Sequence, residues 1–196
     1  MNETISEILN ENKFELVTDK KEEIIEFVHK VNGSEHLLFL WKNHESKDEF
    51  VSEFFNKEFS GNSKGFVSVK PYQDESVENI VYEHFHDQHG KEFIPKAVDK
   101  VTMTVEANKT DSATRFAFED DTWLMERGQT EEVIGTEEKL GPIVDEKLSL
   151  FCFNNVAKLD EAKLNRMIPA HGYVILDEPL SLYKLSNLQV VRYEKN

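Results

Sequence analysis

Apolar residues recur at helical spacing near the start of the chain and form continuous runs further on. Helical spacing predicts helices over residues 2–11 and 20–31, and Gly33 follows the second where a left-handed terminator is expected. Residues 37–41 are apolar throughout, which is typical of a strand buried on both faces of a sheet. An amphipathic helix is predicted over residues 46–60.

The same patterns predict the remaining elements. We expect strands at residues 65–69, 101–105, 148–153, 173–176 and 188–193, and helices at 76–88, 119–127, 130–146 and 159–168. A polar loop is predicted over 108–114, and Gly141 with Pro142 should interrupt the helix that contains them.

Strands that alternate with helices predict an α/β three-layer sandwich with a mainly parallel central sheet. We interpret residues 1–33 as an N-terminal helical extension and residues 34–196 as the α/β domain. No run of about 18 apolar residues occurs, so no membrane-spanning helix is predicted.

The composition restricts the classes of partner. A formal charge of −15 argues against nucleic-acid binding, which requires a basic surface, and against anionic membrane surfaces. The chain has one cysteine, which excludes an internal disulfide and favours a reducing cytoplasm. The acidity is expected to keep the surface soluble, with an acidic face for a basic partner as the alternative.

Three histidines lie close together in the segment 82–90, and they suggest a metal-dependent hydrolase as one alternative function. Their spacing is superficially similar to the metal loop of metallo-β-lactamase-like hydrolases. On a helix, however, His84 and His86 would point about 200° apart, and only His86 and His89 would share a side. A polar helix end is the plainer interpretation, so no metal or other cofactor is assigned.

The chain has no phosphate-binding loop, because no Gly-x-x-x-x-Gly-Lys-Ser/Thr pattern occurs. Residues 42–47, which follow the first buried strand, include no glycine and cannot wrap a phosphate with backbone amides. Asp177 and Glu178 end a later strand, as magnesium-holding acids do in nucleotide hydrolases. Without the loop we interpret them as a solvated strand end.

Cys152 and Trp123 allow more than one role. Cys152 lies in an apolar strand, where it could be a core residue, line a pocket, or act as a nucleophile with His36 or His171 as its base. Trp123 follows three acidic residues that begin with Glu119, and forms either a pocket wall or part of a helix start.

Taken together, these segments resemble the MEDS domain, the sensory domain named from methanogens and methylotrophs, over roughly residues 34–185. The resemblance rests on a histidine that opens an apolar strand, a glycine turn before the second strand, an acid shortly before a tryptophan, a glutamate on the next helix, and a cysteine strand followed by a helix and a histidine. These features correspond to His36, Gly61, Glu119, Trp123, Glu137, Cys152 and His171. The chain departs from the family where Phe153 and Asn154 replace a tyrosine-aspartate pair, and Gly141 stands at a small or amide position.

The resemblance implies a RecA/KaiC-like fold that has lost its phosphate loop and senses small organic molecules. It implies a non-catalytic cytoplasmic domain that signals through a partner protein or a homo-oligomer. We expect the pocket at the carboxyl ends of the parallel strands, as in open α/β sheets. The expected ligand-binding residues are His36, Trp123, Cys152, His171, Glu119 and Glu137. The alternatives are the hydrolase above and a ligand-free adaptor whose pocket has closed.

Overall fold

The computed structural model describes residues 2–30, 35–43, 45–47, 63–67, 114–118, 130–141 and 148–186, together with Met125 and Gly128. Its strands are β1 (Phe14–Thr18), β2 (Glu35–Trp41), β3 (Ser63–Val67), β4 (Thr114–Phe118), β5 (Leu148–Asn155), β6 (Tyr173–Asp177) and β7 (Leu180–Leu185). Its helices are α1 (Asn2–Glu11), α2 (Lys21–Lys30), α7 (Thr130–Leu140) and α8 (Glu161–Met167), with short 3-10 helices η2 (Val156–Lys158) and η3 (Ile168–Ala170).

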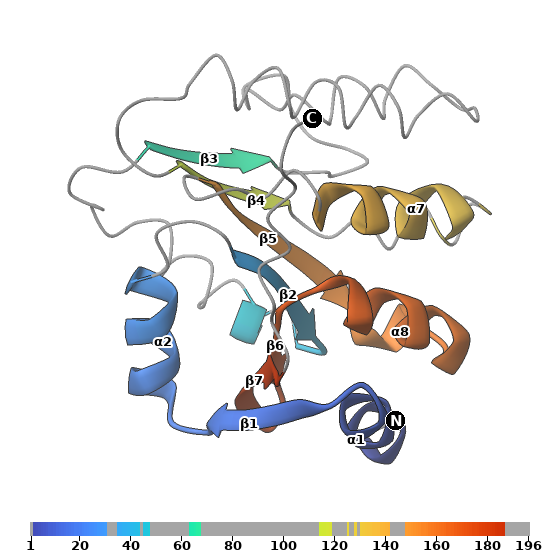
Figure 1. Cartoon of the computed structure of the whole chain (residues 1–196), viewed down its shortest axis with the longest axis horizontal. Coiled ribbons are helices and arrows are strands. Elements are labelled where there is room, and N and C mark those ends of the chain that lie inside the picture. Colours follow the sequence, from blue (N-terminus) through green and yellow to red (C-terminus); the bar gives the residue numbers. More distant parts are fainter. Residues whose placement is uncertain are drawn as a thin grey trace.

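The strands form one seven-stranded mixed sheet in the order β1-β7-β6-β2-β5-β4-β3 (Figure 1). Strand β2 pairs in parallel with both β5 and β6, and β4 pairs in parallel with β5 and β3. The hairpin of β6 and β7 is antiparallel, as is the pairing of β7 with β1. Helices pack on this sheet, so the predicted α/β class is confirmed.

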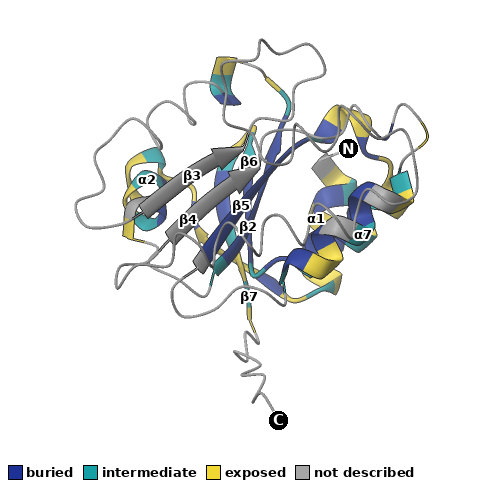
Figure 2. Ribbon diagram, turned by 90° about the horizontal axis from the view of Figure 1, so that it is seen from above, coloured by how far each residue is buried: buried dark blue, intermediate teal, exposed yellow. Residues whose placement is uncertain are grey.

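The two faces of the sheet carry different apolar clusters, because side chains alternate along each strand. Helix α2 covers the face that contains Leu37, Phe39 and Phe151. Helices α1, α7 and α8 cover the other face, which contains Leu38 and Cys152. Figure 1 shows these helices on opposite sides of the sheet, and Figure 2 shows buried residues concentrated along β2, β5 and the inner sides of the helices.

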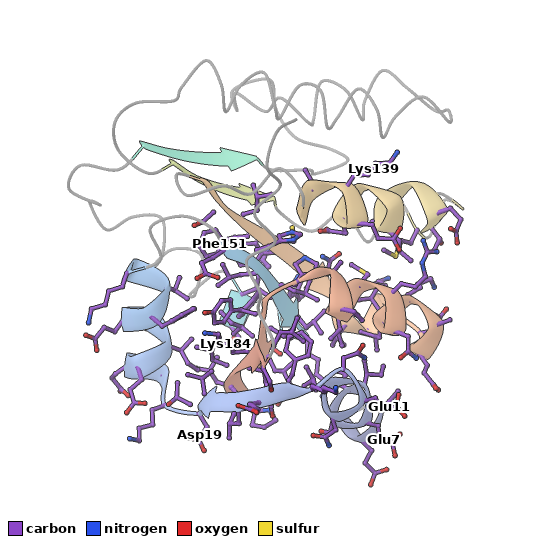
Figure 3. The ribbon with its side chains drawn as sticks, in the orientation of Figure 1. Glu7, Glu11, Asp19, Lys139, Phe151 and Lys184 are labelled. Atoms are coloured by element: carbon purple, nitrogen blue, oxygen red, sulfur yellow. The ribbon has the colours of Figure 1, made fainter. Side chains whose placement is uncertain are left out.

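Charged side chains cap the start of α8 and connect α8 to α7 at the protein surface. The Asp160 carboxylate caps α8 by accepting from the backbone N–H of Lys163 at 3.0 Å. On the outer side of the same helix, Arg166 forms ion pairs with Glu131 and Glu138 of α7. On α1, the acidic side chains of Glu7 and Glu11 point outward (Figure 3).

The N-terminal segment joins the sheet. Helices α1 and α2 lie where their spacing predicted them, but strand β1 connects them and pairs with β7. Ile5, Ile8 and Leu9 of α1 share a core cluster with residues of the sheet. The prediction of a purely helical extension therefore omitted a strand. Leu16 and Val17 are exposed, so β1 lacks the regular alternation that marks a half-buried strand.

Other boundaries also differ from the prediction. Strand β4 occupies Thr114, the last residue of the predicted polar loop, and residues 115–118, to which no element was assigned, and β7 precedes the predicted strand at 188–193. Helix α7 ends at Leu140, next to the predicted break at Gly141. The elements predicted at 76–88, 101–105 and 188–193 lie outside the described residues. Among the described residues, no helix is long and apolar enough to cross a membrane.

Glu35, at the start of β2, provides a test of pH dependence. Burial raises the pKa of this half-buried carboxyl to about 7, against the opposing effects of Lys184 and Tyr173. Its folded pKa exceeds its unfolded value, so the protonated carboxyl stabilises the fold at low pH, and that contribution is lost as pH rises through about 7.

We therefore expect the wild type to lose stability relative to Glu35→Gln between about pH 5 and pH 8.5. Urea denaturation midpoints of the two proteins at both pH values measure the difference, and the comparison cancels other titrating groups. A constant difference between the two proteins across this range would contradict the assignment.

Candidate functional site

Four of the six predicted ligand-binding residues meet in one buried cluster. Their ligand-type atoms, one each from His36, Glu137, Cys152 and His171, all lie within 4.8 Å of one another. The exposed fraction of these residues does not exceed 6%. The other two predicted residues, Glu119 and Trp123, lie outside the described residues, as do His84, His86 and His89.

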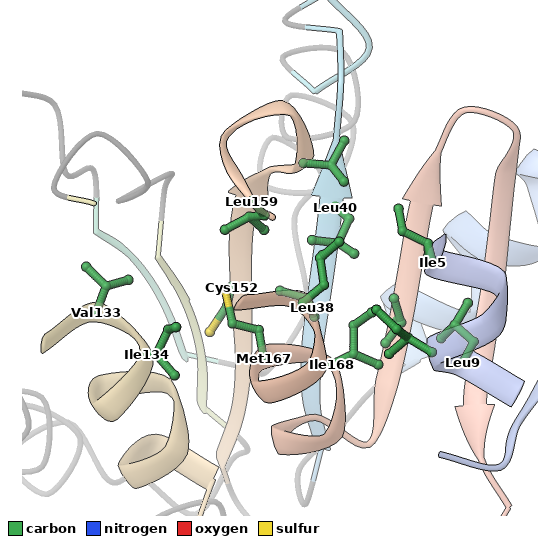
Figure 4. Close-up of a cluster of buried hydrophobic side chains, with 14 of the residues drawn as sticks. Ile5, Leu9, Leu38, Leu40, Val133, Ile134, Cys152, Leu159, Met167 and Ile168 are labelled. Carbon is green, nitrogen blue, oxygen red and sulfur yellow. The ribbon is translucent and has the colours of Figure 1, made fainter. Parts of the chain in front are cut away.

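Strand alternation and register place His36 and Cys152 together. His36 is the second residue of β2, and Cys152 lies opposite Leu38 on the parallel neighbour β5. Cys152 therefore shares a face of the sheet with His36, two rungs further along. Figure 4 shows Cys152 directed from β5 toward Ile134 of α7 and Met167 at the end of α8.

His171 reaches the cluster through the turn between η3 and β6. The backbone N–H of Gly172 donates to the carbonyl of His36 at 2.9 Å, which holds this turn against the start of β2. The imidazole rings of His36 and His171 consequently lie with their centroids 4.0 Å apart.

Helix α7 contributes the carboxylate. Val133, Ile134, Glu137 and Leu140 recur at helical spacing and are all buried, so Glu137 lies on the stripe that faces the sheet. Gly141 follows at the same side, where an added Cβ would be 3.4 Å from Nδ1 of His36. The small residue at this position therefore lets the end of α7 approach the imidazole closely.

Short interatomic distances connect Cys152 to His36, His36 to Glu137, and Glu137 to His171. The sulfur of Cys152 lies 3.4 Å from Nε2 of His36. Oε2 of Glu137 lies 3.8 Å from Nε2 of His36 and 3.3 Å from Nε2 of His171. Neither Oε2 of Glu137 nor Nε2 of His171 forms a hydrogen bond within the described part of the chain.

Backbone carbonyls define the tautomer of both histidines. Nδ1 of His36 donates to the carbonyl of Ala170 at 3.1 Å, and Nδ1 of His171 donates to the carbonyl of Met167 at 2.7 Å. A carbonyl can only accept, so each neutral ring carries its proton on Nδ1 and directs the lone pair of Nε2 into the cluster. Burial, and then the neighbouring His171, holds the pKa of His36 well below its usual range.

The position of the cluster differs from the prediction. The pocket was expected at the carboxyl ends of the parallel strands, but His36 lies at the start of β2 and His171 precedes β6. The rule for open sheets concerns ligands in the crevice outside the strand ends. Here the side chains project from the face of the sheet beneath α7, so that rule does not apply.

A side chain of the protein itself binds the backbone amides that follow the carboxyl end of β2. The Asp177 carboxylate, at the end of β6, accepts from the backbone N–H groups of Lys42 and Asn43 at 2.7 and 3.0 Å. Asp177 ends β6 and is partly exposed, as predicted, and Glu178 beside it is exposed, but the bonds to these backbone amides were not predicted. Its carboxylate engages backbone amides of the segment that follows the first buried strand.

The cluster has the groups for nucleophilic catalysis but lacks access. Cys152 and His36 are within reach of proton transfer, yet Cys152 is completely buried and His36 is 6% exposed. Reactive cysteines are typically partly exposed, which this thiol is not. What the cluster offers is a set of converging acceptor atoms, which is suited to binding a cation.

Sequence reasoning found the four side chains but missed the groups that orient them. The carbonyls of Met167 and Ala170 determine which imidazole nitrogen faces the cluster, and backbone carbonyls leave no trace in residue type. One signal was available for Glu137, because a carboxylate interrupts an otherwise apolar helical stripe.

Comparison with known proteins gives the fold alone. No protein-family model matches the chain, and no match was found among curated proteins. A solved structure from Pyrococcus horikoshii OT3, described as a structural study of project PH0250, is 8% identical with a TM-score of 0.51, and the match covers 77% of this chain and 85% of that one. A Drosophila ORC chain bound to DNA is 12% identical with a TM-score of 0.40, covering 89% and 90% of the two chains. A second ORC structure, with AT-rich DNA and Cdc6, is 13% identical with a TM-score of 0.39, covering 89% of this chain and 56% of that one.

Proposed function

We propose that this chain is a non-catalytic regulatory domain that binds a small ligand at the cluster of His36, Glu137, Cys152 and His171. Ligand binding changes how the domain interacts with a partner protein or with a second copy of itself. The observation that carries the proposal is the convergence of four buried polar side chains, two of which direct unbonded acceptor atoms at each other. Such an arrangement is costly in an apolar core and is expected where a ligand satisfies it.

Two observations support a binding role over a catalytic one. Cys152, which would be the nucleophile of a catalytic site, is completely buried, whereas reactive cysteines are typically partly exposed. The backbone amides that follow β2 are already paired with Asp177, which leaves them no part in holding a phosphate. A nucleotide hydrolase needs such amides in a glycine-rich loop.

We further propose that the domain is of the MEDS type, with a RecA/KaiC-like arrangement of its parallel strands and a cytoplasmic location. The family positions His36, Glu137, Cys152 and His171 are the same four residues that meet in space. Counted from β2 as the first, the parallel strands have the order 5-1-4-3-2 across the sheet, which supports the RecA-like arrangement.

A ligand-free adaptor is the second candidate. It is favoured by the 3.4 Å contact between Cys152 and His36, which closes the space where an organic molecule would lie between these two side chains. The two candidates differ in their response to ligand, because only the regulatory domain requires an occupant. The hydrolase alternative rests on histidines outside the described residues.

The test is a thermal-shift screen of divalent metal ions and small organic compounds on the wild type and His36→Gln. His29→Gln is the matched control, because His29 belongs to α2 on the opposite face of the sheet. We expect at least one ligand to raise the melting temperature of the wild type and the control by several degrees, with little effect on His36→Gln. Sedimentation with and without that ligand then measures self-association. The absence of any such ligand would favour the adaptor, and turnover of a nucleotide would contradict a non-catalytic role.

A further inference from the structure

We propose that the ligand of this cluster is a single divalent transition-metal ion of the Zn²⁺ class. Its ligands would be Nε2 of His36, Nε2 of His171, a carboxylate oxygen of Glu137 and the thiolate of Cys152. The metal site follows from the positions of these four side chains. Its role in signalling rests on the proposed function.

The spacing of the four atoms matches one tetrahedral ion. Zinc bonds of about 2.0 Å to nitrogen or oxygen and about 2.3 Å to sulfur place neighbouring ligand atoms roughly 3.2–3.6 Å apart. Two separations in the cluster, 3.3 Å and 3.4 Å, lie in this range, and the third, between Glu137 and His36, is slightly longer at 3.8 Å. All four atoms lie within 4.8 Å of one another, so small side-chain movements close the remaining distances.

The histidines are already oriented as metal ligands. A histidine that binds through Nε2 commonly donates its Nδ1–H to a backbone carbonyl, which fixes both the tautomer and the ring. Both histidines have this arrangement, to Ala170 and Met167. The lone pair of His171 Nε2 faces the Glu137 carboxylate with no hydrogen bond between them, which is unfavourable until a cation lies between the two acceptors.

Charge balance favours a divalent ion in so dry a place. In the metal-bound form, the carboxylate of Glu137 and the thiolate that Cys152 forms by releasing its proton carry two negative charges, and neutral histidines add none. A divalent cation makes the cluster neutral, whereas a buried uncompensated charge is very costly. The four residues are at most 6% exposed, so solvent cannot supply that compensation.

The donor set selects the metal. Two imidazoles and a thiolate are borderline-to-soft ligands that suit Zn²⁺ and its neighbours, whereas Mg²⁺ and Ca²⁺ require oxygen ligands. Four protein ligands also complete a tetrahedral shell and leave no open position for substrate, which is typical of non-catalytic zinc sites.

Helix α7 is the element that the ion would control. His36, Cys152 and His171 belong to the sheet or its turns, while Glu137 alone comes from α7. Binding would therefore join the helix to the sheet through one bond at its buried stripe. We expect the bound ion to reduce the local unfolding of α7 away from the sheet. We also expect it to change the surface that the helix presents to a partner.

The experiment is a Co²⁺ titration of the metal-free full chain, followed by electronic absorption. One equivalent should give the strong visible bands of tetrahedral cobalt and a thiolate-to-cobalt charge-transfer band. Cys152→Ser should abolish the charge-transfer band, and Glu137→Gln should weaken binding by more than about 10-fold. Glu138→Gln, on the outer face of α7, should bind as the wild type does.

Circular dichroism of each variant establishes that it is folded. A double variant, His86→Gln with His89→Gln, removes the competing histidine cluster and should retain full binding. The metal inference is overturned if the wild type fails to bind Co²⁺ at micromolar concentration. It is also overturned if Cys152→Ser keeps the charge-transfer band, or if the double variant loses binding.

Hydrogen exchange of α7 with and without Zn²⁺ separates this inference from the proposed function. Stoichiometric tetrahedral cobalt with unchanged exchange and unchanged self-association would leave the metal site standing and overturn its signalling role. Conversely, an organic ligand that stabilises the wild type but not His36→Gln, in a protein that binds no metal, would keep the regulatory function and overturn the metal.

Discussion

Replacing Glu137 with glutamine is expected to change stability in opposite directions in the absence and presence of Zn²⁺. Without metal, the Glu137 carboxylate is a buried acceptor beside the Nε2 lone pair of His171. The amide of glutamine can donate to that nitrogen, so the metal-free variant should be more stable by about 1–3 kcal/mol. With free Zn²⁺ at about 1,000 times its dissociation constant, the wild type should gain about 4 kcal/mol that the variant largely loses.

Urea denaturation with chelator and with excess Zn²⁺ measures both effects. Glu138→Gln is the control, because Glu138 lies next in the helix but is exposed and pairs with Arg166. Its effect should stay below about 1 kcal/mol in both conditions. Equal Zn²⁺ stabilisation of the wild type and Glu137→Gln would remove Glu137 from the ligand set. A metal-free variant less stable than the wild type would show that a proton on His171 already neutralises the carboxylate.

Leu38→Ala is expected to destabilise the protein by about 2–5 kcal/mol. Leu38 lies on the central strand β2, is fully buried, and packs in the cluster under α8 and α7 that also contains Cys152 (Figure 4). Removing its side chain loses both the transfer free energy of the buried methyl groups and the contacts around the resulting cavity. At roughly 2–4 °C per kcal/mol for a chain of this length, the melting temperature should fall by about 4–20 °C.

Leu16→Ala is the matched control, because the same substitution is made on strand β1 where Leu16 is 55% exposed. We expect a change within about 0.5 kcal/mol. Thermal unfolding of the three proteins under identical metal conditions gives the comparison. Similar losses in both variants would mean that the β2 core is less tightly packed than the structure shows, or that β1 contributes more to stability than its exposure implies.

The elements that could be predicted from sequence are those with a strong local pattern. The apolar stripe of α2 and the continuous run of β2 were found with small boundary errors, because their periodicity reports burial directly. Strand β1 was missed because Leu16 and Val17 are both exposed on it. Strand β4 was missed because polar residues precede it, and its neighbours in the sheet define it more than its own pattern does.

The residue types of the candidate site could be predicted from the sequence, but the distances among them could not. A histidine at the head of a buried strand and a cysteine within another were conspicuous as residue types in an apolar context, as was His171 before β6. The distances among them depend on the pairing of β2 with both β5 and β6, which connects residues more than a hundred positions apart. Nothing in the local pattern of a strand specifies its partner.

By itself, the sequence determined where several buried segments lie, that strands alternate with helices, and that His36, Cys152 and His171 are polar residues beside or within apolar strands. The tertiary structure decided that His36, Glu137, Cys152 and His171 meet beneath α7 near the start of β2, and that Asp177 occupies the amides at its other end. The physical reason is that burial is encoded locally in the period of apolar residues. Strand order and register instead arise from packing and hydrogen bonding between segments far apart in the chain.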